Sequence, residues 1–372
     1  AAIAQAGAVR SLVGVLTSTR QSMGLKTREL AASILAHLTT DEARGVLNAT
    51  DCVSEGAVKP LMGILELVRV GVSAVVESAA RAAITVLAAL AHHAPKSKGQ
   101  MVEHGIVEQL VHILLWRHNG TQASEPSATD RADIACESLH AEAANTLWSL
   151  SLGNKHGAMP PGIEKALSPL VLLLQPAQQH WRTLTMAAGA IAGLAAGGAS
   201  NQDAARDEGA IPLLVRLLAS PCEGADGADS EPPAALRSGS GVVFAHRPWQ
   251  VQANGATALS ELCKGNEANQ LATSEAGAVA HLIELLQGDD GHQATDRKLA
   301  EGDDDVRGGS RALCSRGSAT NLDSTGTDGG TAWGEAKLSM EGSLGAAIEA
   351  ATCLCSLADG RLAIQTEVSR CG

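Results

Sequence analysis

The sequence has few aromatic residues: among its 372 residues there are no tyrosines, one phenylalanine (Phe244) and five tryptophans. Strands favour aromatic and β-branched residues, whereas the abundant alanine and leucine of this chain are strong helix formers. The composition therefore argues against a β-rich fold, and we expect an all-α protein with an aliphatic core. The hydrophobic share of 45% excludes wholesale disorder.

Paired cysteine spacing is also missing. None of the eight cysteines forms a CxxC motif, and Cys353 and Cys355 are two residues apart, so they point in different directions on a helix. We expect reduced thiols, which are typical of an intracellular protein of the cytoplasm or the nucleus. No uninterrupted apolar run reaches about 18 residues, so we expect no membrane span.

An excess of basic residues is lacking as well, because the formal net charge is −12. Most of this charge lies in three low-complexity stretches, residues 117–136, 220–248 and 287–342. Nucleic acid requires a basic face, so we do not expect it as a partner. The last two stretches are rich in Gly, Ser and Asp, a composition that favours disorder.

The stretch 201–220 is the cleanest copy of a unit that recurs along the chain. A short polar helix is followed by Gly209, which has no Cβ and can end a helix in the left-handed conformation. Pro212 fits the first turn of the next helix, where its missing N–H has no helical acceptor. Leucines then recur with helical spacing, at Leu213, Leu214, Leu217 and Leu218. The pattern predicts a corner between two helices, the second of which must bury an apolar stripe.

Six copies of this corner occur. They begin at Ala6, Glu55, His104, Glu164, Glu208 and Ala276. Five carry glycine at the second position, but Lys165 stands there in the fourth copy, where we expect a looser corner. Each copy is followed by an alanine-rich helical pattern ending in leucine, over residues 29–38, 80–90, 141–150, 185–194, 253–262 and 348–357. Small residues let such a helix approach its neighbours closely, and a unit of this kind must stack on copies of itself.

The short helix, glycine corner, leucine-rich helix and alanine-rich helix resemble the armadillo repeat over essentially the whole chain outside the insertions. Corner-to-corner distances are 49, 49, 60, 44 and 68 residues, and the shortest lies within the range of about 40–47 residues for this class. The resemblance implies a right-handed α-solenoid of about six armadillo-like repeats over residues 1–372, incomplete at both ends. The surplus residues, 117–136, 220–248 and 287–342, fall between the second and third helices, where we predict mostly disordered insertions.

Residue patterns typical of catalysis or metal binding are missing. His104 and His112 are eight residues apart, and His140 precedes Glu142 without the second histidine of HExxH. The acidic clusters 289–290 and 303–305 lack the alternating oxygen ligands of a calcium loop. Glycine runs lack the ending of a phosphate loop, and no GxSxG motif occurs. We therefore expect no catalytic residue, no metal and no cofactor.

Binding remains as the expected function. In armadillo proteins, partners generally lie along a concave surface formed by each repeat's third helix. The resemblance therefore implies that the alanine-rich helices of this chain bind a protein or an extended peptide. We predict eight partner-binding residues on this surface: His37, Arg81, His140, Asn145, Trp148, Ser149, Glu261 and Ser356. Trp148 is the best single candidate, since aromatic residues are enriched in binding hot spots, although packing between helices is an alternative role for it.

A non-enzymatic binding scaffold is thus our main interpretation, and two alternatives remain open. The resemblance to plant-type U-box ligases with armadillo arrays implies the substrate-recognition array of a larger E3 ubiquitin ligase. The second alternative is an importin-α-like transport adaptor, in which an Asn near the end of each third helix holds the backbone of an extended peptide. The matching places here are His37, Ala89, Ser149, Gly193, Glu261 and Ser356. The missing asparagines count against an adaptor, because alanine and glycine have no amide to pair with a peptide.

Overall fold

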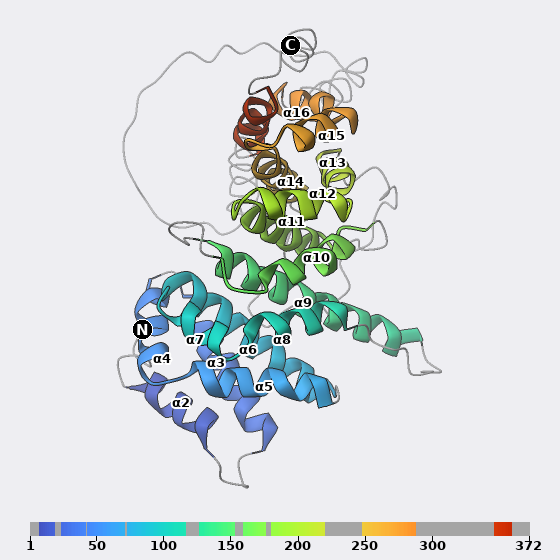
Figure 1. Ribbon diagram of the computed structural model, residues 1–372. Coiled ribbons are helices and arrows are strands. Elements are labelled where there is room, and N and C mark those ends of the chain that lie inside the picture. The colour runs from blue at the N-terminus through green and yellow to red at the C-terminus, as the bar shows by residue number, and fades with distance from the viewer. Residues whose placement is uncertain are drawn as a thin grey trace, which may run out of the picture.

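The structure is a computed structural model of the chain, and it describes residues 7–18, 24–41, 43–70, 73–116, 126–152, 159–175, 180–219, 248–287 and 346–358. All regular secondary structure in these ranges is helical. The helices stack into an elongated array, with α2 to α7 at one end and α13 to α16 at the other (Figure 1). The expected all-α solenoid of armadillo-like repeats is confirmed.

The helices form three sets that correspond to three places in the repeat. The first helices are α4 (Gly45–Ser54), α7 (Ser97–Glu103), α12 (Ala199–Asp207) and α15 (Glu267–Glu275). The second helices are α2 (Ala8–Thr17), α5 (Val58–Val70), α8 (Ile106–Leu115), α10 (Leu167–Leu173), α13 (Ala210–Leu218) and α16 (Ala278–Gln287). The third helices are α3 (Leu25–Thr39), α6 (Ala74–His93), α9 (Pro126–Ser151), α11 (Trp181–Ala195), α14 (Pro248–Cys263) and the helix Ala346–Ala358.

The glycine corners have the expected backbone. Gly209 has a φ of 81° and lies directly before α13, and its N–H donates to the carbonyl of Arg206 at the end of α12. The other four corner glycines have φ between 73° and 84°. A residue with a Cβ is strained at these positive φ values. Glycine therefore forms the corner between the first and second helices without a conformational penalty.

The fourth corner differs from the prediction. The left-handed residue there is Gly162, with a φ of 78°, and not the residue at position 165. A 3₁₀ helix, η2 (Ile163–Ala166), follows Gly162 and leads into α10. Lys165 is therefore part of a regular turn, and the expected looser corner is replaced by a glycine three residues earlier in the chain.

We expect Gly209→Val to lower the free energy of unfolding by about 2 kcal/mol, because a β-branched residue is strained at this φ. No atom lies within 4 Å of a Cβ built on Gly209, so the effect comes from the backbone alone. Gly209→Asn should cost less, since asparagine tolerates the left-handed region. Urea denaturation of both variants measures the difference, and an unchanged midpoint for the valine variant would contradict this account of the corner.

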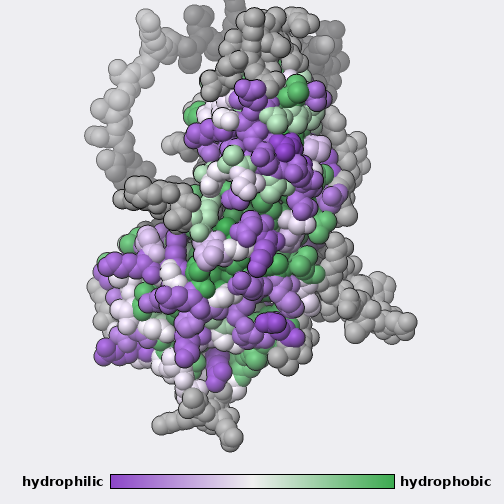
Figure 2. Space-filling view, viewed as in Figure 1, coloured by the Kyte–Doolittle hydropathy of each residue, from purple (hydrophilic) through white to green (hydrophobic). Residues whose placement is uncertain are grey.

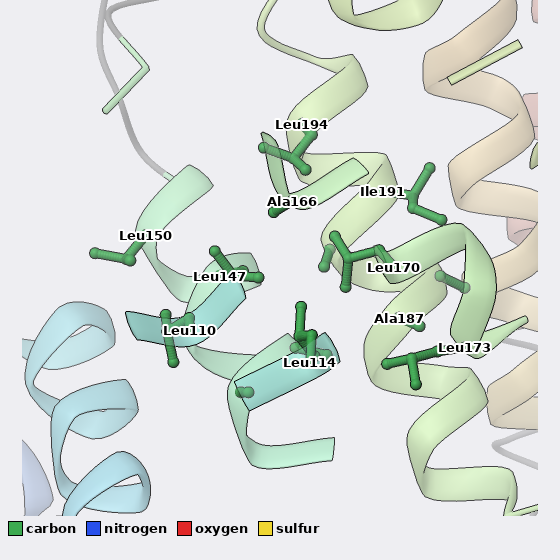
Figure 3. Packing of buried hydrophobic residues seen from close by; sticks show 14 of the residues in the cluster. Leu110, Leu114, Leu147, Leu150, Ala166, Leu170, Leu173, Ala187, Ile191 and Leu194 are labelled. Carbon is green, nitrogen blue, oxygen red and sulfur yellow. The ribbon is translucent and has the colours of Figure 1, made fainter. Parts of the chain in front are cut away.

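The second and third helices bury a continuous apolar core. Figure 3 shows part of it, with side chains from four helices gathered together: Leu110, Leu114, Leu147, Leu150, Leu170, Leu173, Ile191 and Leu194. These side chains are at most 5% exposed. Burial of one such residue contributes about 1.5–3 kcal/mol, and each contacts residues of a neighbouring helix, so no repeat forms its core alone.

Side-chain caps join a third helix to the first helix that follows it. The amides of Asn48, Asn201 and Asn269 and the hydroxyl of Ser97 donate to the carbonyls of Leu38, Leu194, Leu262 and Leu90, over 2.6–3.0 Å. In each case the accepting residue is the last leucine of the alanine-rich stretch. Carbonyls in the last turn of a helix lack their usual intrahelical partner. Those of Leu90 and Leu194 also accept from the N–H groups of Ala94 and Gly197, so the side-chain bonds add a second donor there and link the two helices.

The junction between α9 and α10 uses a different cap. In the ranges that the structure describes, no first helix lies between these two helices. Lys98, on α7, donates instead to the carbonyls of Leu150 and Leu152 at the end of α9. Partial burial lowers the pKa of Lys98 below its ordinary value.

The cysteines that can be described are free. Cys52, Cys263 and Cys353 are buried and Cys355 is exposed. Burial raises the pKa of Cys52 to about 12 and that of Cys263 to about 11. The buried thiols are therefore neutral at physiological pH and act as small apolar residues of the core.

The insertions lie mostly outside the described residues. This holds for 117–125, 220–247 and 288–345, so their predicted disorder stays a prediction. The backbone of 126–136, which we had placed in the first insertion, forms the start of α9. The expectation that the array is incomplete at both ends also stays a prediction.

Candidate functional site

The candidate site is the row of third helices. They pack in chain order, α3 against α6, then α9, α11 and α14, along the length of the array (Figure 1). The helix Ala346–Ala358 joins the row beside α14, through hydrogen bonds from Thr257 to Glu349 (3.0 Å) and between Ser260 and Ser356 (2.9 Å). Alanine and glycine at the contacts permit this close approach. A partner that lies across the row contacts every repeat.

Neighbouring third helices touch through a regular set of positions. Each helix has an anchor residue three places before its last leucine: Leu35, Leu87, Leu147, Ile191, Leu259 and Leu354. On the later helix of a pair, the contacting residue lies two places after its anchor. On the preceding helix, the contacting residue lies one place after its anchor. Ser356 meets Ser260 in this way, and a Cβ on Gly193 would lie 3.4 Å from Trp148. This is the place that holds asparagine in importin-α, and at Gly193 and Ser356 it faces the neighbouring helix.

Trp148 packs against two glycines of α11. A Cβ on Gly189 would lie 2.7–2.9 Å from three atoms of the Trp148 ring. The indole is half-buried and lies over these glycines. Gly189 and Gly193 are therefore needed for the close approach of α9 and α11. Trp148 serves as a packing residue, and only the exposed remainder of its side chain is available to a partner.

Polar side chains also connect neighbouring third helices. Ser78 on α6 donates to Glu29 on α3 over 2.6 Å, and Arg182 on α11 forms an ion pair with Glu142 on α9. Burial alone would raise the pKa of Glu29, but the hydrogen bonds from Lys26 and Ser78 outweigh it and hold the pKa below its ordinary value. Glu29 is thus ionised at neutral pH and already has its partners within the fold.

Arg81 and Asn145 differ from these residues. Arg81 is exposed on α6, and Asn145 is half-buried on α9. Their side chains make no hydrogen bond or ion pair with the described part of the chain, and the charge of Arg81 acts on Glu29 only at longer range. Two adjacent third helices therefore offer polar groups that are free to bind another molecule.

The other predicted residues lie in varied surroundings. His37 is exposed in the last turn of α3. His140 is buried and its Nε2 lies 2.9 Å from the carbonyl oxygen of Trp116, at the end of α8. Ser149 is also buried. A partner would not reach His140 or Ser149 without movement of the helices, so neither lies on the surface that the sequence suggested.

The last two predicted residues lie at the C-terminal end of the row. Glu261 is partly exposed and lies 3.8 Å from Lys264 of the same chain segment. The hydroxyl of Ser356 bonds to Ser260 and to the carbonyl of Thr352. Both side chains are thus engaged within the fold, and only part of each faces solvent.

Four residues of the row were missed in the sequence: Arg182, Met186, Asn254 and Thr257. All are partly exposed on α11 or α14. Thr257 lies two places before its anchor, as Asn145 does, while Met186 and Asn254 lie five places and Arg182 nine places before theirs. Aligning the anchors and including these earlier positions would have found them.

In the part of the chain that the structure describes, potential metal ligands do not cluster and one helix is unusually apolar. Within the described ranges, no group of three or more His, Cys, Asp or Glu residues could hold a metal ion. The helix α6 is long and apolar enough to cross a membrane, with a mean hydropathy of 1.6. However, 56% of that stretch is buried inside the array, where α6 packs between α3 and α9, so its apolar composition is that of a core helix.

Exposed aliphatic residues are scattered over the array, for example Leu47, Leu115, Leu172 and Leu271. Figure 2 shows apolar residues mixed with hydrophilic ones on one face, with the apolar residues gathered mainly near the middle of the array. Single exposed leucines are common on protein surfaces. They do not mark a binding site by themselves.

Comparison with known proteins supports the fold. No protein-family model and no curated protein sequence matches this chain. An engineered protein of known structure is 24% identical to this chain, with a TM-score of 0.53. The match covers 78% of this chain and 97% of the engineered protein. Two designed armadillo repeat proteins, one solved in complex with the peptide (KR)4, are each 20% identical over 78% of this chain and 97% of theirs, with TM-scores of 0.50. These similarities show that the chain has the armadillo-like repeat fold.

Proposed function

We propose that this protein is a non-enzymatic scaffold that binds a protein or an extended peptide along its row of third helices. A designed protein with this fold was solved in complex with a peptide, which supports this kind of partner. The observation that carries the proposal is the pair of free polar side chains, Arg81 and Asn145, on the adjacent helices α6 and α9. Arg81 lies six places before the anchor of α6 and Asn145 two places before the anchor of α9, a difference of about one helical turn.

The chemistry of these two residues suits an extended backbone. An extended chain exposes its N–H and carbonyl groups, and the Asn145 amide can donate and accept at the same time. The Arg81 guanidinium can donate to carbonyl oxygens or to a carboxylate of the partner. The exposed part of the Trp148 side chain, three residues after Asn145 on α9, adds apolar contact area.

We further propose that the protein works inside the cell, in the cytoplasm or the nucleus. The support is the free thiol of Cys355, which is exposed, together with the three buried free thiols. Free thiols persist in reducing compartments.

The two alternative functions are not proposed. A transport adaptor that holds peptide backbone through asparagines would need them where α11 has Gly193, beside Trp148. A role as the array of a ubiquitin ligase depends on a catalytic domain, and no described residue favours it.

We expect Arg81→Ala and Asn145→Ala each to weaken peptide binding about 5–30-fold, which corresponds to about 1–2 kcal/mol. The probes are peptides selected against the purified chain from a random-peptide display library and labelled with a fluorophore. Fluorescence anisotropy gives the Kd for each variant, because the lost hydrogen bonds weaken the complex without changing the fold.

Arg10→Ala is the matched control. Arg10 lies on α2, outside the row, and pairs with Glu55 at the surface. Its replacement should leave the Kd unchanged, and circular dichroism should show the same helix content for all three variants. Peptides that bind the Arg81 and Asn145 variants as tightly as the original chain, or that lose equal affinity with Arg10→Ala, would contradict binding along the third helices.

A further inference from the structure

Two arginines lie on one face of the row, on the helices that flank α9. Arg81 lies six places before the anchor of α6, and Arg182 lies nine places before the anchor of α11. Asn145 lies two places before the anchor of α9, between them. Each residue advances by about 100° around a helix, so these three places fall within about 60° of one another. The three side chains therefore leave the same face of the row.

The carboxylates that interact with these arginines are buried. Glu142 on α9 is 4% exposed and pairs with Arg182, whose side chain is 37% exposed. Glu29 on α3 is 5% exposed and is held by Lys26 and Ser78. The negative groups thus lie inside the fold, while the positive side chains reach solvent.

Two further carboxylates on these helices lie away from the face. Glu77 and Glu137 each lie ten places before the anchor of their helix, about 40° beyond the place of Arg81. Both are half-buried and have partners of their own. Among the described side chains of α6, α9 and α11, the permanently charged groups on this face are therefore the two guanidinium groups.

Both guanidinium groups keep N–H donors for another molecule. A guanidinium has five donors, and the bond from Arg182 to Glu142 uses one terminal nitrogen. Arg81 makes no hydrogen bond within the described part of the chain. Two parallel N–H donors of a guanidinium fit the two oxygens of a carboxylate. The groups that suit this face are therefore the side chains of aspartate and glutamate.

The separation of the two arginines sets the spacing of these acidic side chains. In the row, α9 lies between α6 and α11, and the axes of packed helices are about 8–10 Å apart. Two such steps give about 16–20 Å, which about five to six residues of an extended chain span at about 3.3 Å per residue.

We propose that the peptide bound along the row is acidic, with two Asp or Glu side chains about five to six residues apart that pair with Arg81 and Arg182. The inference rests on the proposed function and names the chemistry of its partner. A basic peptide such as (KR)4, which a designed armadillo repeat protein binds, would place like charges at both arginines. The net charge of −12 disfavours a long polyanion such as RNA more than a short peptide with two acidic residues.

Peptides selected against the purified chain from a random-peptide display library test the inference. Those that lose affinity for the Asn145→Ala variant occupy the row, and they should carry pairs of acidic residues at this spacing. Replacing both acids of such a peptide by Asn or Gln should raise the Kd at least about tenfold. An increase from about 50 to about 500 mM NaCl should also raise the Kd several-fold, because salt screens exposed charge pairs.

Variants of the chain assign the charge to particular residues. Arg81→Glu should weaken binding of the acidic peptides at least about tenfold, and a peptide with Lys in place of the matching acid should regain affinity for this variant. The double variant Glu142→Gln with Arg182→Gln removes the other cation without leaving a buried carboxylate unpaired, and it should weaken binding to a similar extent. Lys59→Glu is the control for charge reversal, because Lys59 is exposed on α5, outside the row. Its Kd should be unchanged, and circular dichroism should show that all variants fold.

The outcomes separate this inference from the proposed function. Peptides that depend on Asn145 but are neutral or basic, or that bind Arg81→Glu as tightly as the original chain, overturn the acidic partner and leave peptide binding intact. An equal loss of affinity in Lys59→Glu also overturns it, since overall charge alone would then decide. A labelled oligothymidylate that binds more tightly than the acidic peptides, and loses affinity in Arg81→Glu, would assign the face to phosphate instead. If no selected peptide depends on Asn145, the proposed function fails, and the acidic partner fails with it.

Discussion

Replacing Gly189 by valine should lower the free energy of unfolding by about 3 kcal/mol or more. A Cβ at this position would lie 2.7–2.9 Å from three atoms of the Trp148 ring. An indole is rigid and cannot give way by a small torsion, so α9 and α11 would have to separate. Because each third helix packs on the next, such a separation would disturb the core on both sides. Chemical denaturation followed by circular dichroism measures the loss.

Gly63→Ala is a matched control for this result. Gly63 lies inside the helix α5, and no atom lies within 4 Å of a Cβ built on it. Alanine in a helix interior is more favourable than glycine by about 0.5–1 kcal/mol, so this variant should be slightly more stable. A valine at position 189 that costs no more than about 1 kcal/mol would refute the described contact between α9 and α11.

The Trp148→Ala variant tests whether the steric contact between the indole ring and position 189 causes the loss of stability. In a Trp148→Ala background the ring is absent, and Gly189→Val should then cost much less than in the original chain. The difference between the two costs is the interaction energy of the pair in a double-mutant cycle. Equal costs in both backgrounds would show that the ring isn't the source of the destabilisation.

Asn269→Leu should cost about 3 kcal/mol, since it removes three hydrogen bonds made by one buried side chain. The Asn269 side chain is fully buried, and its amide donates to the carbonyls of Leu262 and Gln202 over 2.9 and 3.2 Å. Its oxygen accepts from Arg206 over 3.1 Å. Leucine has a similar volume but no polar group, so the Leu262 carbonyl in the last turn of α14 would be buried without this donor, and the Gln202 carbonyl and Arg206 would each lose one partner. Urea denaturation at constant pH measures the change.

Asn254→Leu provides the comparison for this prediction. Asn254 is partly exposed on α14 and donates only to the carbonyl of Gln250 on the same helix. Its replacement should change the free energy of unfolding by no more than about 1 kcal/mol. Similar losses for both asparagines would mean that the cap between α14 and α15 contributes little to stability.

The sequence predicts features that depend on local conformation. The corner at Gly209 could be recognised because a left-handed residue between two helices requires glycine or pays a steric cost. The fourth corner was misplaced because Gly162 lies three residues before the aligned position, and a 3₁₀ turn fills the gap. No periodic pattern distinguishes such a turn from the first turn of a helix.

The site is harder to predict, because its residues depend on contacts between repeats. His140 was expected to face a groove, but it is buried beside the carbonyl of Trp116 on another helix. Trp148 could be placed on a third helix, but its contact with Gly189 depends on the spacing of α9 and α11. Arg81 is exposed and Asn145 is half-buried on the third helices, and their role in binding stays a prediction.

The cap formed by Lys98 has a consequence for how the array unfolds. At four junctions an amide or hydroxyl on a first helix binds the third helix of the preceding repeat, which couples the two repeats. Lys98 and the end of α9 belong to the same repeat, so this cap adds no coupling across the boundary that follows. Coupling across that boundary therefore rests on the packing of α9 against α11, including the contact of Trp148 with Gly189. In a linear array cooperativity ends where the nearest-neighbour coupling is weakest, so we expect Gly189→Val to give separate hydrogen-exchange protection on the two sides of the boundary between α9 and α10.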